Sequence, residues 1–265
     1  MNAPETAAMG LLLREDRDGV VTLTLNRPAQ FNALSEELLA ELQAALDSIA
    51  ADDRVRAVVI AGAGKAFCAG HDLKQMRANH GKEYMQALFR QCGKVMMTIT
   101  RMPQPVIARI HGIATAAGCQ LVAMCDLAVA ADVAKFAVSG INVGLFCSTP
   151  SVALGRAMGR KEAMEMLLTG EFIDAGEAQR RGLINRAVPA DQLDAAVKRL
   201  TDSICAKSSV AVAMGKQLFY RQLEMGLDGA YQLASETMAC NMMTEDAVHG
   251  IDSFMAKQPP VWKGR

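Results

Sequence analysis

Apolar residues in this chain fall into two patterns, short continuous runs and stripes at helical spacing. Ser35 has the residue type of a helix N-cap, and the apolar positions after it recur every three or four residues, which predicts an amphipathic helix. A second helix is predicted over residues 81–100. Continuous apolar runs predict buried strands over residues 20–25, 55–61, 106–110 and 127–131. Such alternation is typical of an α/β fold with a mainly parallel sheet.

The pattern changes near residue 190. Before it, the chain repeats strand–strand–helix units, with a hairpin at Asp18-Gly19 near the start and short helices expected over 151–158, 160–168 and 174–181. After residue 190 the pattern is almost wholly helical, and no low-complexity linker separates the two parts. We therefore predict an α/β core over residues 1–190 and a helical C-terminal lobe over residues 191–265.

Charge and hydropathy limit the classes of partner. Acidic and basic residues balance at 28 each, which gives no general attraction to nucleic acid or to an anionic membrane. The apolar stretch over 106–124 is interrupted by Arg109, His111 and Gln120, so we do not expect it to span a membrane. Residues 1–10 have neither a basic segment nor an apolar one, so no secretory signal is expected.

The cysteines indicate a reducing compartment. The seven are an odd set, they lie mostly in apolar runs, and they form no CxxC pair and no Cys/His cluster with zinc spacing. We expect buried free thiols, a cytoplasmic location, no metal and no cofactor.

Two small-residue turns stand out as candidate chemistry, one over residues 65–74 and the other over 111–121. Each is expected to leave a buried strand and enter a helix. The first N–H groups of a helix have no partner within it, so two such turns that meet can bind a developing negative charge. Small-residue turns are also common packing devices, so the spacing alone does not assign them a ligand.

Motifs in these turns resemble those of the crotonase (enoyl-CoA hydratase/isomerase) superfamily. The resemblance spans nearly the whole chain and rests on a set of short motifs in the family's order: Leu25-Asn26-Arg27-Pro28, residues 66–73, His111-Gly112, Gly118-Cys119, Cys125-Asp126, Gly170-Glu171 and residues 250–257. It implies a crotonase (ClpP-like) spiral of strand–strand–helix units with a helical C-terminal lobe. It also implies an acyl-CoA thioester as ligand and a homotrimer or a dimer of trimers.

The resemblance also implies a set of site residues. The backbone N–H groups of His71 and Ala117 correspond to the family's oxyanion hole, which polarises the thioester carbonyl. The coenzyme A (CoA) moiety, which is part of the substrate, is expected to contact Ala29, Gln30, Phe31, Ala69, Asp72, Leu73 and Lys74, and also Phe254 and Lys257 from a neighbouring subunit. The His71 side chain is expected either to enter the pocket, a pattern similar to methylmalonyl-CoA decarboxylases, or to leave only its backbone there.

The chain departs from the family's hydratases at both catalytic glutamates. Gln120 and Gly140 stand at the two corresponding positions. An amide can orient water, but it cannot take up a proton near neutral pH, and glycine supplies no group at all. Loss of a positioned proton-transfer group costs about 10²–10⁴-fold in rate, so ordinary hydration should be slow.

Three functions remain open. One is an acyl-CoA reaction that needs little proton transfer, such as decarboxylation of a malonyl-type thioester. The others are slow enoyl-CoA hydration assisted by Gln120 and non-catalytic binding or regulation by acyl-CoA. If the scaffold is preserved, glutamates introduced at positions 120 and 140 should restore hydration.

Overall fold

The computed structural model describes residues 10–265, so the expectation about a signal at the chain start lies mostly outside it. Its larger sheet has six strands in the order β1-β2-β3-β5-β7-β10. The hairpin of β1 and β2 is antiparallel, and all later pairs are parallel. Asp18 and Gly19 both have positive φ in the two-residue turn, as the Asp-Gly pair predicts. The strands are β1 (Leu12–Arg17), β2 (Val20–Leu25), β3 (Ala57–Gly62), β5 (Val106–Ile110), β7 (Leu127–Ala131) and β10 (Arg186–Val188).

A second sheet has four short strands in the order β4-β6-β8-β9. Strands β3, β5 and β7 of the first sheet are each followed directly by β4, β6 and β8 of the second, so the chain turns the same corner repeatedly. This arrangement confirms the α/β class and the strand–strand–helix repeat. The strands are β4 (Ala66–Cys68), β6 (Ile113–Thr115), β8 (Lys135–Ala137) and β9 (Ile173–Asp174).

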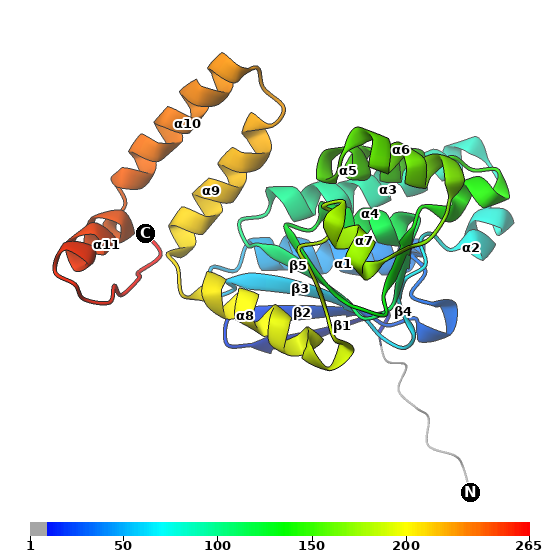
Figure 1. The fold of residues 1–265 in the computed structure, drawn as a ribbon, viewed down its shortest axis with the longest axis horizontal. Coiled ribbons are helices and arrows are strands. Elements are labelled where there is room, and N and C mark those ends of the chain that lie inside the picture. Colours follow the sequence, from blue (N-terminus) through cyan, green and yellow to red (C-terminus); the bar gives the residue numbers. More distant parts are fainter. Residues whose placement is uncertain (1–9) are drawn as a thin grey trace, which may run out of the picture.

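Helices cover both faces of the six-stranded sheet (Figure 1). The apolar stripes of α1 and α3 pack with Leu23 and Ile60 on one face, whereas α8 packs on Val59 and Ile107 on the other. Ser35 caps α1 as predicted, because its side chain accepts a hydrogen bond from the Leu38 N–H. The helices of this part are η1 (Pro28–Gln30), α1 (Glu36–Ala50), α2 (Leu73–Ala78), α3 (Lys82–Arg101), α4 (Ala117–Met124), η2 (Ser139–Val143), α5 (Ser148–Ala157), α6 (Arg160–Thr169), α7 (Ala175–Arg180), η3 (Ala190–Gln192) and α8 (Leu193–Cys205).

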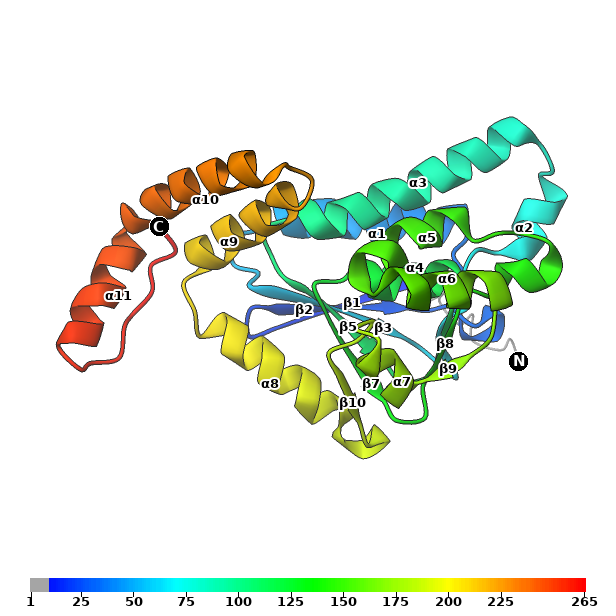
Figure 2. The ribbon, with the colours of Figure 1, turned by 45° about the horizontal axis from the view of Figure 1, so that its top comes forward.

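The last three helices, α9 (Ser209–Gln222), α10 (Leu227–Met242) and α11 (Glu245–Met255), extend away from the sheets (Figures 1 and 2). Large apolar side chains on them are exposed, among them Leu227, Tyr231, Met238 and Phe254. None of the helices among residues 10–265 combines the length and apolar character needed to cross a bilayer. The exposed apolar side chains on α9–α11 form surfaces that a single chain leaves uncovered.

A buried polar cluster fixes α9 to the core. The Lys216 ammonium donates to the carbonyls of Ile99 and Gln104 and to the Asp126 carboxylate, at 2.6–2.8 Å. The same carboxylate accepts from the Val106 N–H at the start of β5 and from the Tyr220 hydroxyl. Every donor of the ammonium thus has an acceptor, which is the condition for burying such a charge. We call Asp126, Lys216 and Tyr220 the Asp126 cluster.

Candidate functional site

Three neighbouring parallel strands of the small sheet end at the same edge. Strand β4 pairs with β6, and β6 pairs with β8. The residues that follow these strands are the turn containing His71, the start of α4 at Ala117, and Gly140 in η2. Ligands of α/β proteins commonly bind at the carboxyl ends of parallel strands. The fold therefore brings three of the predicted site positions to one edge of a sheet.

The first two turns are in close contact. A β-carbon added to Gly70 would lie 3.2 Å from the amide nitrogen of Ala117, and one added to Gly118 would lie only 2.1 Å from the Cys68 carbonyl oxygen. Glycine is therefore required at position 118, where any side chain would collide with backbone. This contact brings the peptide before His71 close to the first N–H of α4.

Neither the His71 N–H nor the Ala117 N–H has an acceptor among the described residues. In the parallel bridge between Leu34 and His71, Leu34 donates to the Gly70 carbonyl and accepts from Asp72, so the His71 N–H faces the other side. Among residues 10–265, no hydrogen bond uses the N–H of His71 or that of Ala117 as donor. Their role in an oxyanion hole stays a prediction.

The residue before Ala117 has a strained backbone. Ala116 has φ 50° and ψ −121°, a conformation that glycine adopts readily and alanine does not. Its N–H donates to the Ala137 carbonyl at the end of β8, which holds the turn in place. Ala117 itself begins the helix, so its own substitution for glycine needs no unusual dihedral angle. Strain of this kind persists where the surroundings fix the backbone.

The His71 ring packs against Phe89 of α3, with the centroids 5.4 Å apart in an edge-to-face arrangement. Its Nε2 atom is buried and has no hydrogen-bond partner among the described residues. Burial lowers the pKa of the imidazole to about 4, because a charged ring would lose its hydration. The ring is therefore neutral at physiological pH, and its inner edge is turned into the protein.

Gln120 is buried as well, and its Oε1 atom has no partner in the described part of the chain. It lies in the first turn of α4, where its N–H donates to the Ala116 carbonyl. Helical side chains lean toward the N-terminus of their helix, so the Gln120 amide is directed back toward the turn that contains Ala117. Residues 117 and 120 thus belong to the first turn of α4, which lies beside the turn that contains Gly70 and His71.

Gly140 leaves no room for a side chain. An added β-carbon would lie 2.6 Å from the Leu145 carbonyl oxygen and 2.7 Å from the Cys147 sulfur. The Leu145 N–H in turn donates to the Gly140 carbonyl at 2.9 Å, which closes the loop. Burial raises the pKa of the Cys147 thiol, so this sulfur is not an activated nucleophile. The expectation that glutamate at position 140 would simply restore a hydratase site therefore conflicts with the packing.

The loop after Arg27 is anchored beside the first turn. Asn32, which is fully buried, donates to the carbonyls of Ala63 and Ala66 and accepts from the Arg27 N–H. The Ala69 N–H donates to the Phe31 carbonyl. The predicted contacts Ala29, Gln30 and Phe31 are exposed on this loop. Sequence reasoning missed Asn32, because a single asparagine in a loop gives no signal of burial.

Asp72 is occupied by the protein itself. Its carboxylate pairs with Arg27 at 2.8 Å and caps α2 by accepting from the N–H groups of Lys74 and Gln75. Desolvation is the largest single influence on the pKa of the Asp72 carboxyl and raises it. The hydrogen bonds from Arg27 and from the two N–H groups together outweigh desolvation, so the pKa is lowered. Asp72 thus positions the exposed Leu73 and Lys74.

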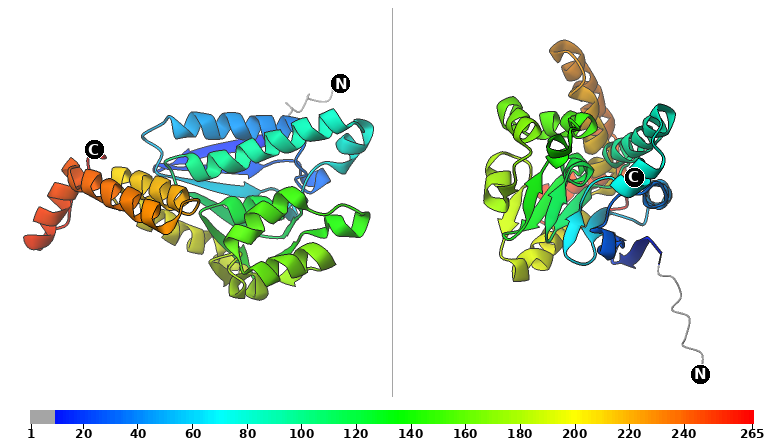
Figure 3. Two further views of the ribbon diagram at one scale, coloured as in Figure 1. Left: turned by 90° about the horizontal axis from the view of Figure 1, so that it is seen from above. Right: turned by 90° about the vertical axis from the view of Figure 1, so that its right-hand side faces the viewer.

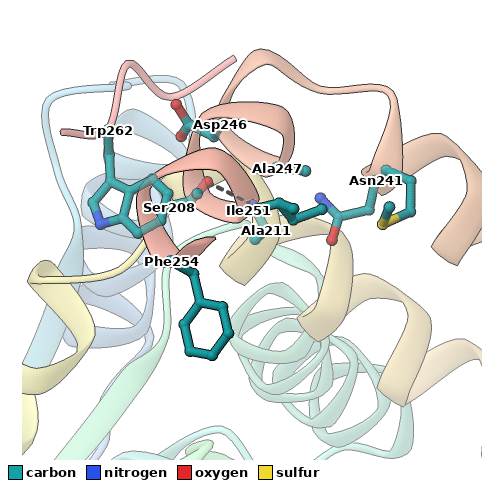
Figure 4. Close-up of a pocket in the computed structure, with 10 residues that line it drawn as sticks. Ser208, Ala211, Asn241, Asp246, Ala247, Ile251, Phe254 and Trp262 are labelled. Carbon is teal, nitrogen blue, oxygen red and sulfur yellow. Dashed lines mark hydrogen bonds between the residues drawn. The ribbon is translucent and has the colours of Figure 1, made fainter. Parts of the chain in front are cut away.

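Phe254 and Lys257 lie far from these turns. They belong to the end of α11 and the segment after it, at the opposite end of the molecule from α2 (Figures 1 and 2, and the left view of Figure 3). Phe254 lines a mostly apolar cavity of about 330 Å³ between α9, α10, α11 and Trp262 (Figure 4). In one subunit, then, these two residues are not brought to the candidate site.

Among residues 10–265, no three His, Cys, Asp or Glu side chains are grouped to share a metal ion.

Comparisons with known proteins find relatives over nearly the whole chain. The family model described as enoyl-CoA hydratase/isomerase matches residues 15–265. Enoyl-CoA hydratase domain-containing protein 3, mitochondrial, of Xenopus laevis is 46% identical over 252 residues, which are 95% of this chain and 86% of that protein. A probable enoyl-CoA hydratase of Rhizobium meliloti is 35% identical and covers 96% of this chain and 98% of its own.

Solved structures share the whole fold. The crystal structure of an enoyl-CoA hydratase from Mycobacterium smegmatis has a TM-score of 0.95 and 60% identity, and the match covers 96% of this chain and 99% of that one. The human enoyl-CoA hydratase domain-containing protein 3 has a TM-score of 0.93 and 43% identity, with 96% and 100% of the chains covered. The predicted crotonase fold is confirmed.

Proposed function

Because this chain belongs to the enoyl-CoA hydratase/isomerase (crotonase) family, we propose that it binds an acyl-CoA thioester and holds the carbonyl oxygen between the N–H groups of His71 and Ala117. The observation that carries the proposal is the contact of the two turns: a β-carbon added to Gly70 would lie 3.2 Å from the Ala117 nitrogen, and neither the His71 N–H nor the Ala117 N–H has an acceptor among the described residues. Two preorganised donors stabilise charge that develops on an oxygen, and removal of one such donor costs about 10²–10³-fold in rate.

The proposed reaction is one that needs the oxyanion hole and little else. Decarboxylation of a malonyl-type thioester meets that condition: the bond between the α-carbon and the carboxylate carbon breaks, CO₂ leaves, and the electron pair forms an enolate on the thioester. The N–H groups of His71 and Ala117 hold the enolate oxygen, and the α-carbon then takes a proton from water. Gln120 and the filled space at Gly140 supply no base for hydration.

Two alternatives make different predictions. A slow hydratase would add water to crotonyl-CoA, and its rate would fall further in Gln120→Leu, because the amide would orient that water. A non-catalytic binder would hold CoA thioesters without forming product from any of them. Turnover assays with malonyl-, methylmalonyl- and crotonyl-CoA separate the three functions.

A proline at position 117 tests the proposed amide directly. Proline is accepted at the first position of a helix and has no N–H. We expect Ala117→Pro to lose the added affinity of acyl-CoA over free CoA, and to lose any turnover. Arg160→Pro, at the first and exposed position of α6, is the matched control and should keep both. Unchanged thioester affinity in a folded Ala117→Pro protein would contradict the proposal.

For the rest of the ligand, we propose that CoA runs past Ala29, Gln30, Phe31, Ala69, Leu73 and Lys74. The hydrogen bond from the Ala69 N–H to the Phe31 carbonyl, which holds the loop beside the first turn, supports this path. Asp72 contributes by orienting α2. Lys257 and Phe254 can reach this surface only from another subunit, where the ammonium would meet a phosphate as a mobile point charge.

The exposed apolar surfaces support a ring-shaped assembly. One set lies on α9–α11, and a different set lies around η2, α5 and α6, with Val143, Phe146 and Leu168 exposed. Two unlike surfaces that pair form a head-to-tail interface, which gives a ring when the rotation between neighbouring subunits closes. We propose a homotrimer, alone or as a dimer of trimers. Light scattering should give three or six subunits, and Phe254→Glu should lower that number and weaken CoA binding.

A further inference from the structure

The segment after α11 runs back along that helix (Figure 1). The chain reverses direction at Lys257, whose φ is 55°. Residues 258–265, which we call the strap, then return to the first turn of the helix, where the Asp246 N–H donates to the Arg265 carbonyl at 2.9 Å. The strap and α11 therefore close a loop, and Phe254 and Lys257 lie at its far end.

Asp246 fixes the returning end of the strap. It is the second residue of α11 and is buried, with only 2% of its surface exposed. Its carboxylate accepts from the N–H groups of Lys263 and Gly264, at 2.7 and 3.0 Å. Hydrogen bonds to a charged group are stronger than those between neutral groups, so this one side chain ties the strap to the start of the helix.

Trp262 fixes the middle of the strap. Its indole N–H donates to the Ala206 carbonyl at the end of α8, at 2.8 Å. Its ring lies on α11 at Gly250, where an added β-carbon would be 3.0 Å from two ring carbons. The absence of a side chain at Gly250 therefore leaves room for the indole. The ring lines the same cavity as Phe254 (Figure 4).

The strap buries little apolar surface of its own. Trp262 is half-buried, and the other seven residues of the strap are exposed. What the hydrogen bonds fix is the end of α11, where Phe254 is 84% exposed and Lys257 has a left-handed backbone that residues with a β-carbon rarely adopt. Exposed helix ends fray unless they are tied down, and the strap ties this one.

We infer that Asp246 and Trp262 are positioning residues for the CoA moiety bound by a neighbouring subunit. They act through the strap, which holds Phe254 and Lys257 in one place. The inference rests on the proposed function, in which these two residues meet CoA from another subunit. It adds two residues that do not touch CoA themselves, and it involves no part of the oxyanion hole.

Amide hydrogen exchange tests whether the strap holds the end of α11. We expect Asp246→Ala and Trp262→Leu to raise the exchange rate at residues 254–258 by about tenfold, because the loop is no longer closed. Trp262 is the only tryptophan of the chain, so its fluorescence should also shift to the red in Asp246→Ala as water reaches the indole. Asp228→Ala removes an acid from the same position of α10 and should change neither signal.

Calorimetric titration with free CoA tests the consequence for the ligand. Asp246→Ala and Trp262→Leu should each bind CoA about five- to tenfold more weakly than the wild type. The gain in affinity from CoA to a thioester should stay as in the wild type, because the oxyanion hole is untouched. In a Phe254→Ala, Lys257→Ala double variant, Asp246→Ala should cost less than about twofold more, since the residues that it positions are gone.

The outcomes separate the inference from the proposed function. The inference is wrong if residues 254–258 exchange at the wild-type rate in both strap variants, or if both bind CoA as tightly as the wild type. It is also wrong if Asp246→Ala weakens CoA binding equally in the double variant. If neither free CoA nor a thioester binds the wild-type protein, the proposed function itself is wrong.

Discussion

Two groups of buried polar residues in this protein are built in opposite ways. In the Asp126 cluster, the carboxylate, the ammonium and the hydroxyl all have partners within the chain, and the cluster joins α9 to the core. At the edge of the small sheet, His71 and Gln120 have no side-chain partner among the described residues, and Ala116 is strained. The first group holds a structure together, whereas the second is costly to the folded protein.

The hydrogen bonds of buried polar side chains distinguish a group that stabilises the fold from one that the fold leaves unsatisfied. A buried polar group left without a hydrogen bond costs about 1–3 kcal/mol, so a protein retains few of them by chance. His71 and Gln120 belong to two adjoining turns in which the His71 N–H and the Ala117 N–H also have no acceptor among the described residues.

Removal of Asp126 should produce the largest loss of stability. Asp126→Ala leaves the Lys216 ammonium buried without its counter-charge, and we expect a loss of about 3–5 kcal/mol in the free energy of unfolding. By contrast, His71→Phe and Gln120→Leu remove groups without partners and should cost less than about 1 kcal/mol. Urea denaturation of the three variants measures both sides of the comparison. Equal losses at Asp126 and Gln120 would remove the distinction.

Acid should destabilise the wild type through His71. The ring has a pKa of about 4 in the folded protein against the ordinary 6.5, so the unfolded chain binds the additional proton as the pH falls below 6.5. Between pH 7 and 4 this contributes a loss of about 2–3 kcal/mol, reduced somewhat by the partly exposed ring. The His71→Phe variant lacks this imidazole, so acid should lower its free energy of unfolding less. The free energies of unfolding of the two proteins should therefore converge or cross at low pH.

His80 provides the matched control, because it is exposed in the turn before α3. The pH dependence of unfolding in His80→Gln should follow that of the wild type. If His71→Phe shows the same acid slope as the wild type, the imidazole is not held neutral by burial.

The glycine at position 140 should resist any side chain. Gly140→Ala places a β-carbon against the Leu145 carbonyl, and we expect a cost of about 1–3 kcal/mol. Gly155→Ala within α5 meets nothing within 4 Å and should instead stabilise by about 0.5–1 kcal/mol. Thermal unfolding of the pair checks the opposite signs. A tolerated Gly140→Glu that gains hydratase activity would show that the loop yields easily.

The smallest effect concerns the strained turn. Ala116→Gly relieves a positive φ and should stabilise the protein by about 0.5–1 kcal/mol after the entropy cost of glycine. Ala117→Gly, at a helical position, should destabilise by about the same amount. A stability gain at position 117 rather than 116 would mean that the strain lies elsewhere.

Much of the fold could be predicted from residue patterns. Val106–Ile110 and Leu127–Ala131 are strands with the predicted bounds, and Ser35 and Asp174 cap helices as their positions indicate. The strands β4 and β6 were missed, because three residues are too few to show a periodic pattern. Their pairing is what brings the two turns together, so the site could be inferred only through the family resemblance.

The finer features of the site depend on packing. Nothing in the sequence indicates that Asn32 anchors the CoA-side loop, that Phe89 packs on His71, or that the Leu145 carbonyl fills the space beside Gly140. These contacts join residues far apart in the chain, and local patterns contain no information about them.

The most direct measurement is a crystal structure with a bound short-chain acyl-CoA ester. We predict that the thioester carbonyl oxygen lies about 2.7–3.2 Å from the backbone nitrogens of both His71 and Ala117. An ester bound with its carbonyl oxygen out of reach of both nitrogens would contradict the account.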